Sequence, residues 1–258
     1  MSLAGRGAVV TGGGRGIGRA VARALAAEGA AVVVTARSAD EIESVAAELR
    51  AEGHTAHAIP CDVADESSVQ AMAEEAAGLV GTVDVLVNNA GIALSNPVKR
   101  LPLQEWNQIM AINATGTFLC TRAFIQGMID RAWGRVINVS SVAGLRGGRY
   151  IAAYTASKHA QVGFTRALAA EVADKGITVN AICPGYVDTP MAEYSISRMV
   201  EKAGITAEEA LDHLRSLNPQ HRLIRPEEIA HVALMLCGEN GVGINGQAIA
   251  IDGGHGFH

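Results

Sequence analysis

Hydrophobic and polar residues alternate along this chain in two kinds of segment. Short runs rich in Val, Ile and Ala are separated by longer segments in which apolar residues recur every three or four positions. A short apolar run suits a strand buried on both faces of a sheet, and the longer period is that of an amphipathic helix. Regular alternation of the two predicts an α/β protein with a doubly wound parallel sheet.

Seven runs are candidate strands: residues 7–11, 31–35, 55–59, 85–87, 136–139, 177–182 and 248–251. The first helical stripe, within residues 17–25, ends at Gly29, and the second, within residues 42–49, ends at Gly53, as helices commonly do. No linker or repeat divides the chain, so we predict one Rossmann domain over residues 1–258. Residues 189–219 are polar, helix-prone and contain no strand pattern, and we expect them to form a substrate lid.

Composition narrows the class of ligand. The 258 residues are 49% apolar and only 18% charged, which excludes a disordered chain. The formal net charge is −5 and there is no basic run, so nucleic acid and anionic membrane surfaces are not expected partners. A small-molecule substrate is the expected partner.

Cysteine and histidine usage points away from disulfides and metals. Cys61, Cys120, Cys183 and Cys237 each stand alone in apolar segments, and neither CxxC nor HExxH occurs. We expect reduced, buried thiols and no metal site. The N-terminus lacks a signal-peptide pattern and no apolar run reaches the length of a membrane span, so we expect a soluble cytoplasmic protein.

A glycine-rich loop follows the first strand. Residues 11–18 read Thr-Gly-Gly-Gly-Arg-Gly-Ile-Gly, with Gly12, Gly16 and Gly18 in GxxxGxG spacing, and they open the first helix. Glycines let the backbone turn sharply and let a pyrophosphate approach the free N–H groups of the helix N-terminus. An ordinary turn needs only one or two glycines, so the loop predicts a dinucleotide site.

The end of the second strand indicates which dinucleotide. Where NAD-binding folds carry an acidic residue for the ribose hydroxyls, this chain has Ala36 followed by Arg37. Arg37, together with Arg15 of the loop, is suited to the extra phosphate of NADP, so NADP is favoured and NAD is the alternative. Two solvated surface arginines are the plainer interpretation. Asp40 and Glu41 are interpreted as residues of the first helical turn rather than ribose ligands.

Further polar motifs occur at or after the later predicted strands, in the order of the chain. Asn88-Asn89-Ala90-Gly91 follows the fourth strand, Asn113 lies in the next helix, Ser141 ends the fifth strand, Tyr154 and Lys158 open a helix as YxxxK, and Pro184-Gly185 follows the sixth strand. With the glycine loop, these motifs resemble those of the short-chain dehydrogenases/reductases over essentially the whole chain. The resemblance implies a hydride-transferring oxidoreductase.

By this resemblance, a set of residues spread over the strand ends binds the cofactor: Gly12, Arg15, Gly16, Ile17, Gly18, Arg37, Asp62, Val63, Asn89, Ala90, Gly91, Tyr154, Lys158, Pro184, Gly185, Val187 and Thr189. Asp62 would bind the adenine amino group, although an Asp between a strand and a helix is often only an N-cap. The segment from Asn88 to Gly91 is expected to be as structural as it is cofactor-binding.

Tyr154 and Lys158 are spaced i, i+4, so a helix would direct both side chains to one face. Lowering the pKa of a tyrosine from about 10 to about 7 takes roughly 4 kcal/mol, comparable to one cation at about 4 Å in an effective dielectric of about 20. We therefore expect Lys158 to lower the pKa of Tyr154, the general acid/base. The resemblance adds Ser141 as a donor to the substrate oxygen and Asn113 as the holder of a water that relays protons through Lys158. Strand alternation turns the neighbouring Ser140 away.

Apolar and aromatic residues around the expected cleft indicate a hydrophobic ketone or secondary alcohol: Leu145, Ile151, Tyr186, Met191 and Tyr194. The C-terminal third is similar to 3-oxoacyl and polyketide ketoreductases, so a 3-oxoacyl group, including a thioester, is expected. Arg146 and Arg149 suit a carboxylate or phosphopantetheine, although loop arginines are more often solvated. An NAD-dependent alcohol or 3-hydroxy acid dehydrogenase is the alternative, and a non-catalytic dinucleotide sensor is the alternative of another class. The resemblance also implies a homotetramer.

Overall fold

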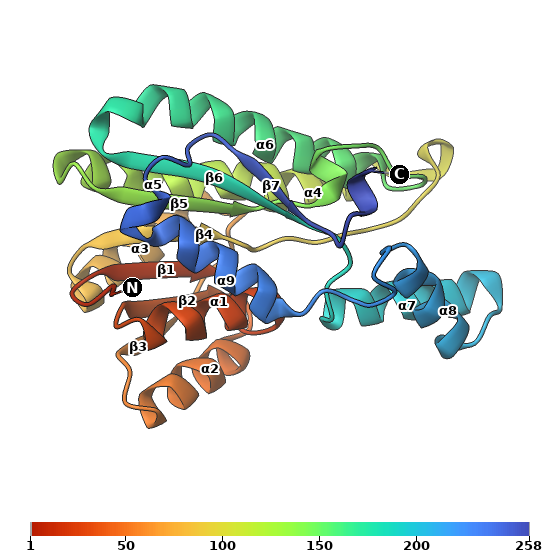
Figure 1. Ribbon diagram of the computed structural model, residues 1–258, viewed down its shortest axis with the longest axis horizontal. Coiled ribbons are helices and arrows are strands. Elements are labelled where there is room, and N and C mark those ends of the chain that lie inside the picture. Colours follow the sequence, from red (N-terminus) through yellow and green to blue (C-terminus); the bar gives the residue numbers. More distant parts are fainter. Residues whose placement is uncertain (1, 258) are drawn as a thin grey trace.

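A single seven-stranded parallel sheet forms the centre of the computed structural model, which describes residues 2–257. The strand order is β3-β2-β1-β4-β5-β6-β7 (Figure 1). Their bounds are β1 Gly7–Thr11, β2 Ala31–Ala36, β3 Ala56–Pro60, β4 Val83–Asn88, β5 Gly134–Val139, β6 Ile177–Pro184 and β7 Ala248–Ile251. The predicted fold class and all seven strands are confirmed, with ends that differ by a few residues.

Helices cover both faces of the sheet. On one face lie α1 (Gly16–Ala27), α2 (Ala39–Ala51) and α9 (Pro226–Cys237), and on the other α3 (Glu66–Val80), α4 (Leu103–Met110), α5 (Gly116–Asp130) and α6 (Ala152–Val172). A π-helix, Ala111–Thr115, joins α4 to α5. Short 3-10 helices lie at Val98–Arg100, Val142–Gly144, Ala173–Lys175, Glu239–Gly241 and His255–Phe257.

The pleat of the strands divides the core into two layers. Val10 and Val34 pack with Val21 and Leu25 of α1, whereas Val9 of β1 packs toward α3 and α5. These strands are buried on both faces, which explains why they appear as continuous apolar runs in the sequence.

The strand order reverses between β1 and β4. Connections leave these two neighbouring strands in opposite directions, so their carboxyl ends open a crevice that helices do not fill. The glycine loop follows β1 and Asn89 follows β4, which brings both motifs to this crevice.

Helices α7 (Pro190–Ala203) and α8 (Ala207–Ser216) project from the sheet as a pair (Figure 1). The segment leaves after Val187 and returns at Ile224, where these two residues form a parallel β-bridge. Two residues before Ile224, the Arg222 guanidinium donates to both carboxylate oxygens of Glu228 on α9, at 2.6 and 2.8 Å. The expected strand-free excursion is therefore helical and is fastened where it begins and ends.

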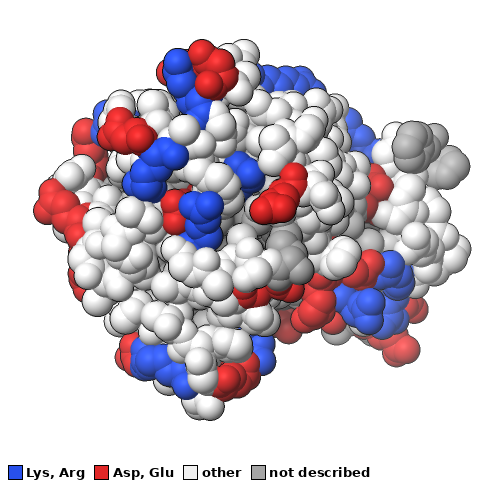
Figure 2. Space-filling view, turned by 60° about the vertical axis from the view of Figure 1, so that its left-hand side comes forward, with Lys and Arg blue, Asp and Glu red and all other residues white. Residues whose placement is uncertain are grey.

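Surface and thiol features agree with the sequence. On the face shown in Figure 2, basic and acidic side chains lie beside one another in small groups between wide uncharged areas. All four cysteines are buried and free, as predicted. Among the helices of residues 2–257, none is long and apolar enough to cross a membrane.

Candidate active site

Two adjoining cavities open at the carboxyl ends of the strands. The larger, about 720 Å³, lies along the glycine loop and the ends of β2, β3 and β4. The smaller, about 290 Å³, lies between the end of β5, the start of α6 and the start of α7. Ile17, Asn89, Gly91 and Thr189 line both, so the two cavities form one continuous site.

The glycine loop is a cradle that side chains would fill. Gly12 and Gly16 have φ of 62° and 52°, and a Cβ on Gly12 would lie 2.9 Å from Nδ2 of Asn89. That Asn89 amide donates to the carbonyls of Thr11 and Gly12, at 2.9 and 3.0 Å, and so ties β4 to the loop. Helix α1 begins at Gly16 with no side chain capping its N–H groups. These features fit a bound pyrophosphate.

Gly18 has a different role from the other two glycines of the motif. A Cβ there would lie 2.2 Å from the carbonyl oxygen of Gly12, and Gly18 does not line either cavity. Gly18 therefore lets the helix pack closely on the loop and acts on a cofactor only through that packing.

Beyond the loop, the larger cavity ends among Ala36, Arg37, Ser38, Glu41 and Asp62. Glu41 lies in the first turn of α2, as the sequence predicted, and it also reaches the cavity. Its carboxylate lines the cavity and lies 3.6 Å from the Arg15 guanidinium. Spacing alone could not show this, because the place of Glu41 depends on how the first turn of α2 packs against Gly14 of the glycine loop.

Asp62 is not a helix cap. The N-cap of α3 is Asp65, whose carboxylate accepts from the backbone N–H groups of Ser67 and Ser68. Asp62 instead accepts from the N–H of Ala64 at 3.0 Å and lines the cavity beside Val63. Asp62 therefore lies in the cavity, and its binding to an adenine amino group stays a prediction.

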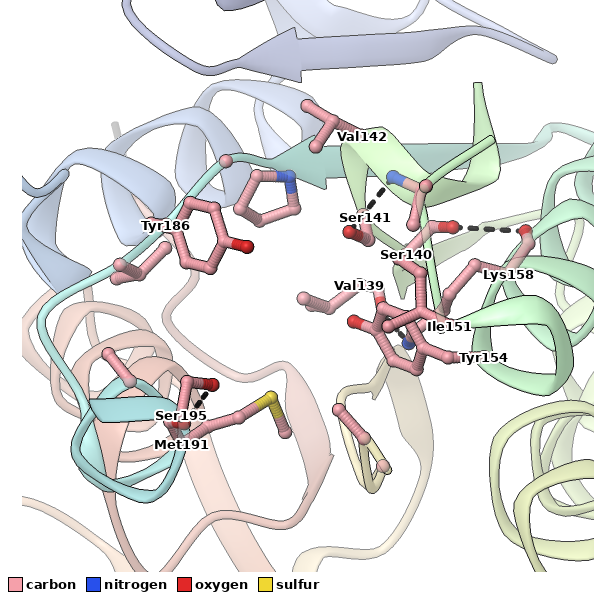
Figure 3. Close-up of a pocket in the computed structure, with 18 of the residues that line it drawn as sticks. Val139, Ser140, Ser141, Val142, Ile151, Tyr154, Lys158, Tyr186, Met191 and Ser195 are labelled. Atoms are coloured by element: carbon pink, nitrogen blue, oxygen red, sulfur yellow. Dashed lines mark hydrogen bonds between the residues drawn. The ribbon is translucent and has the colours of Figure 1, made fainter. Parts of the chain in front are cut away.

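Tyr154 and Lys158 lie on the first turns of α6, and Ser141 lies two residues after the end of β5. Figure 3 shows the hydroxyls of Tyr154 and Ser141 on one side of the smaller cavity, facing Tyr186 and Met191 across it. Ser141 accepts from the N–H of Ala143 at 3.1 Å, which fixes its orientation. The Ser140 hydroxyl donates to the Lys158 carbonyl at 3.1 Å, so its hydrogen is already committed.

Lys158 is almost completely buried, with 3% of its surface exposed. Its Nζ donates to the carbonyl of Val139 at 2.9 Å and to Oε1 of Gln161 at 2.8 Å, and it lies 5.7 Å from the centre of the Tyr154 ring. Burial disfavours the ammonium form and lowers the pKa of Lys158 to about 7.

The expected lowering of the Tyr154 pKa is not found. Burial raises the pKa of Tyr154 to about 12, against the smaller opposing effect of a hydrogen bond with Ser141. Desolvation penalises the phenolate as it penalises the ammonium, whereas the prediction from the sequence rested on the attraction of one cation at about 4 Å. Tyr154 is therefore a protonated phenol at neutral pH.

Asn113 is fully buried in the π-helix between α4 and α5 and does not line either cavity. Its amide exchanges hydrogen bonds of 2.9 Å with the backbone of Ile92 and donates to Ser157 at 3.0 Å. The backbone carbonyl of Asn113 accepts from the Thr117 hydroxyl at 2.8 Å. The side chain thus fastens the segment after β4 to α6, and π-turns of this kind are frequent at functional sites.

Pro184, Gly185, Val187 and Thr189 form one rim of the smaller cavity. The Thr189 hydroxyl donates to the Val187 carbonyl at 3.2 Å, and Thr189 is the residue from which α7 begins. The bridge between Val187 and Ile224 fixes this loop from behind.

Of the five residues expected to contact substrate, four line one of the two cavities and one lies at the surface. Ile151, Tyr186 and Met191 line the smaller cavity, and Tyr194 lines the larger one. Leu145 lines neither, because its side chain is turned to the surface and is 41% exposed. Ser195, one turn after Met191 on α7, lines the smaller cavity and was not singled out by the sequence.

The charged side chains that line the smaller cavity are all basic among residues 2–257. Arg146 and Lys158 line it, and no Asp or Glu does so among residues 2–257. The Arg146 guanidinium donates from Nη1 to the His255 carbonyl at 2.6 Å, while Nη2 is enclosed without an acceptor from the described part of the chain. Within that part, no three residues of the His, Cys, Asp and Glu types are grouped to hold a metal.

A glycine cradle at the point where strand order reverses, joined to a cavity with tyrosine, lysine and serine at its wall, defines a dinucleotide-binding oxidoreductase. Residues 6–199 match the family model of the short chain dehydrogenases, and the chain belongs to this family.

Similar proteins are reductases and dehydrogenases. The chain is 36% identical to 3-oxoacyl-(acyl-carrier-protein) reductase of Aquifex aeolicus, over 98% of both chains. It is 38% identical to D-beta-hydroxybutyrate dehydrogenase of Rhizobium meliloti, over 96% of this chain and 97% of the other. Among solved structures, a variant of actinorhodin polyketide ketoreductase with NADPH superimposes with a TM-score of 0.96 at 37% identity, and each chain is covered completely. A putative gluconate 5-dehydrogenase from Beutenbergia cavernae, with bound NADP, has a TM-score of 0.89 at 38% identity and 98% coverage of both chains.

Proposed function

We propose that this protein is an NADPH-dependent ketone reductase in which Tyr154 donates the proton. The observation that carries the proposal is the placement of the Tyr154 and Ser141 hydroxyls on one wall of a cavity that continues into the glycine cradle. When bound, NADPH supplies the hydride, and the chain must supply the proton and the orientation of the carbonyl.

Each polar residue then has one task. Tyr154 donates its phenolic proton to the carbonyl oxygen, and Ser141 donates a hydrogen bond that orients the same oxygen. Because burial raises the pKa of Tyr154 to about 12, the phenol is fully protonated in the resting site. Oxidation of an alcohol would instead need the phenolate as base.

The cofactor preference is proposed from the larger cavity. Ala36 leaves the ribose end without an acidic side chain at the strand end, and Arg37 and Arg15 line the same region. These two guanidinium groups suit a 2′-phosphate, and two solved relatives contain NADPH or NADP. Glu41 is the observation that favours NAD as the second candidate, because it places one carboxylate beside Arg15.

The substrate class is proposed from the smaller cavity. Its wall is mainly apolar, and at about 290 Å³ it lies at the small end of ligand cavities. Arg146 adds one cation, and no Asp or Glu of residues 2–257 lines the cavity with it, so a 3-oxoacyl compound with an apolar body and an acceptor or anionic group is favoured. Relatives named as 3-oxoacyl reductases support the acyl part.

A matched panel tests this function. Purified protein is assayed with NADPH and with NADH against a 3-oxo acid, its methyl ester and its N-acetylcysteamine thioester. We expect the rate with NADPH to exceed that with NADH, and Arg146→Gln to affect the free acid more than the ester. A folded protein that binds NADPH but reduces no ketone with either cofactor would favour the non-catalytic sensor.

The pair α7–α8 is proposed to be a lid over the substrate. Met191 on α7 lines the smaller cavity yet is 41% exposed. Closure of α7 over a bound ligand would bury this apolar side chain. Hydrogen exchange is measured with and without NADPH and a substrate analogue. A lid gains protection in residues 190–216 only when the cavities are filled, whereas a permanently packed pair shows equal protection in both states.

A homotetramer is proposed from the family resemblance and from exposed apolar side chains beside the π-helix. Leu103 on α4 is 72% exposed and Phe118 on α5 is 42% exposed. Light scattering coupled to size exclusion measures the assembly, and a monomeric mass at micromolar concentration would contradict this proposal.

A further inference from the structure

Gln161 is a buried amide in direct contact with Lys158 that the sequence motifs did not single out. It lies three residues after Lys158 on α6, on the face turned to the protein interior, and only 1% of its surface is exposed. Its Oε1 accepts from Nζ of Lys158 at 2.8 Å, and its Nε2 donates to the Thr117 hydroxyl at 2.7 Å. Both ends of the amide are therefore engaged.

The direction of the hydrogen bonds in this chain follows from its far end. The Thr117 hydroxyl donates its single hydrogen to the backbone carbonyl of Asn113, at 2.8 Å. Toward Gln161 it can therefore only accept. The amide nitrogen of Gln161 must then face Thr117, and the amide oxygen must face Lys158. An oxygen at that position bonds an N–H donor of Lys158 and presents no hydrogen to it.

Two of the three N–H donors of the Lys158 ammonium are thereby occupied, by the Val139 carbonyl and by Gln161. Neither bond uses the third N–H, and the centre of the Tyr154 ring lies 5.7 Å from Nζ. Hydrogen bonds from both acceptors oppose the desolvation that disfavours a buried ammonium.

We propose that Gln161 is a positioning residue that keeps the Lys158 ammonium charged and fixes its remaining N–H toward the reacting end of the site. The consequence for catalysis rests on the function proposed above, whereas the effect on Lys158 itself does not. The link also reaches the Asn113 carbonyl through side chains, where the resemblance implied a water relay. A carboxamide passes no proton under these conditions, so Gln161 supports Lys158 without supplying protons to it.

The pKa of Lys158 can be measured without any assay of activity. The chain has four lysines, Lys99, Lys158, Lys175 and Lys202, and only Lys158 is buried. Labelling lysine Cε with carbon-13 gives four resonances, and Lys158→Met assigns the buried one. Titration of wild type is expected to give a pKa near 7, because burial lowers it to about 7.

Two variants alter the acceptor in opposite ways. Gln161→Met fills similar space without an acceptor, and removal of a bond to a charged group is expected to lower the Lys158 pKa by about one to two units. Gln161→Glu keeps an acceptor and adds negative charge, so the pKa is expected to rise. The ammonium exists below its pKa, so the alkaline fall of kcat/KM for reduction should shift to lower pH in Gln161→Met and to higher pH in Gln161→Glu.

Thr165→Val is the matched control. Thr165 is as buried as Gln161 and donates to its backbone carbonyl at 2.8 Å, but it has no contact with Lys158 among the bonds of this network. This variant should lose stability while leaving the Lys158 pKa unchanged. An unchanged pKa in folded Gln161→Met, or in Gln161→Glu if Gln161→Met does not fold, would overturn the proposal. A shifted pKa with an unshifted activity profile would support the role of Gln161 and overturn the role of Lys158 in the proposed reaction.

Discussion

The two cavities of the site are built in different ways. The larger one is walled by the ends of four neighbouring strands and by the loop between β1 and α1, all within the first 112 residues apart from the start of α7. The smaller one combines the ends of β5 and β6, the loop carrying Arg146, helix α7 and His255 near the C-terminus. One cavity is thus fixed by backbone geometry, and the other by side chains on segments that can vary.

This difference decides how mutations should act. Apart from its glycines, a cradle of backbone N–H groups is little affected by single side-chain changes, whereas a proton donor in a side-chain cavity has no substitute. The largest effects on turnover are therefore expected in the smaller cavity, and graded effects on cofactor choice in the larger one.

Tyr154→Phe is expected to lower kcat for reduction by about 10²–10⁴, because it removes the transferable proton and little else. Stopped-flow and steady-state assays measure the rate, and NADPH titration by fluorescence serves as the control for an intact cofactor cavity. Retention of more than about a tenth of wild-type kcat would show that another group donates the proton. Lys158→Ala, by contrast, should damage both turnover and cofactor affinity.

Ala36→Asp combined with Arg37→Ala is expected to lower kcat/KM for NADPH by roughly ten- to a hundredfold and to improve use of NADH. The change removes one charge-assisted bond and adds an acceptor for ribose hydroxyls. Parallel assays with both cofactors give the ratio. If wild type already prefers NADH, the assignment of Arg37 is wrong, and the fold is unaffected by that result.

Glu41→Gln is expected to have the smallest effect, a gain of up to about fivefold in NADPH affinity. It releases Arg15 from a carboxylate 3.6 Å away, and an ion pair this exposed contributes little. The gain should shrink at high salt, as screening weakens the competing pair. Asp40→Asn, in the same turn of α2, is the matched control, and an equal gain there would assign the effect to general charge.

The sequence predicted those parts of the site that depend on local pattern. Tyr154 and Lys158 share a face because they are one helical turn apart, and the glycine loop fixes its own geometry. Glu41 was not recognised as part of the cavity, because its place depends on how α2 packs beside the loop. A signal for Gln161 did exist, since a polar residue at i+3 from Lys158 shares its face of the helix, and that face is the buried one.

Electrostatics was the part that sequence reasoning misjudged. The spacing of Tyr154 and Lys158 correctly predicted that they are neighbours, but a pKa depends on how much water each group loses. Lys158 is enclosed by β5 and α6, with its ammonium on the Val139 carbonyl, and no one-dimensional pattern reports that enclosure. Desolvation therefore reversed the expected direction for Tyr154.

The parallel bridge between Val187 and Ile224 has a consequence for how this chain can be altered. Because the two ends of the α7–α8 segment are side by side, reinforced by hydrogen bonds from Asp188 to Ile224 and from Ile224 to Tyr186, the intervening residues form a closed loop on the scaffold. The entropy of closing such a loop grows only slowly with its length, about 0.6 kcal/mol for each doubling. We therefore expect segments of different length and sequence to be accepted between these two residues with β6 unmoved, so that the proposed lid is exchangeable as one unit.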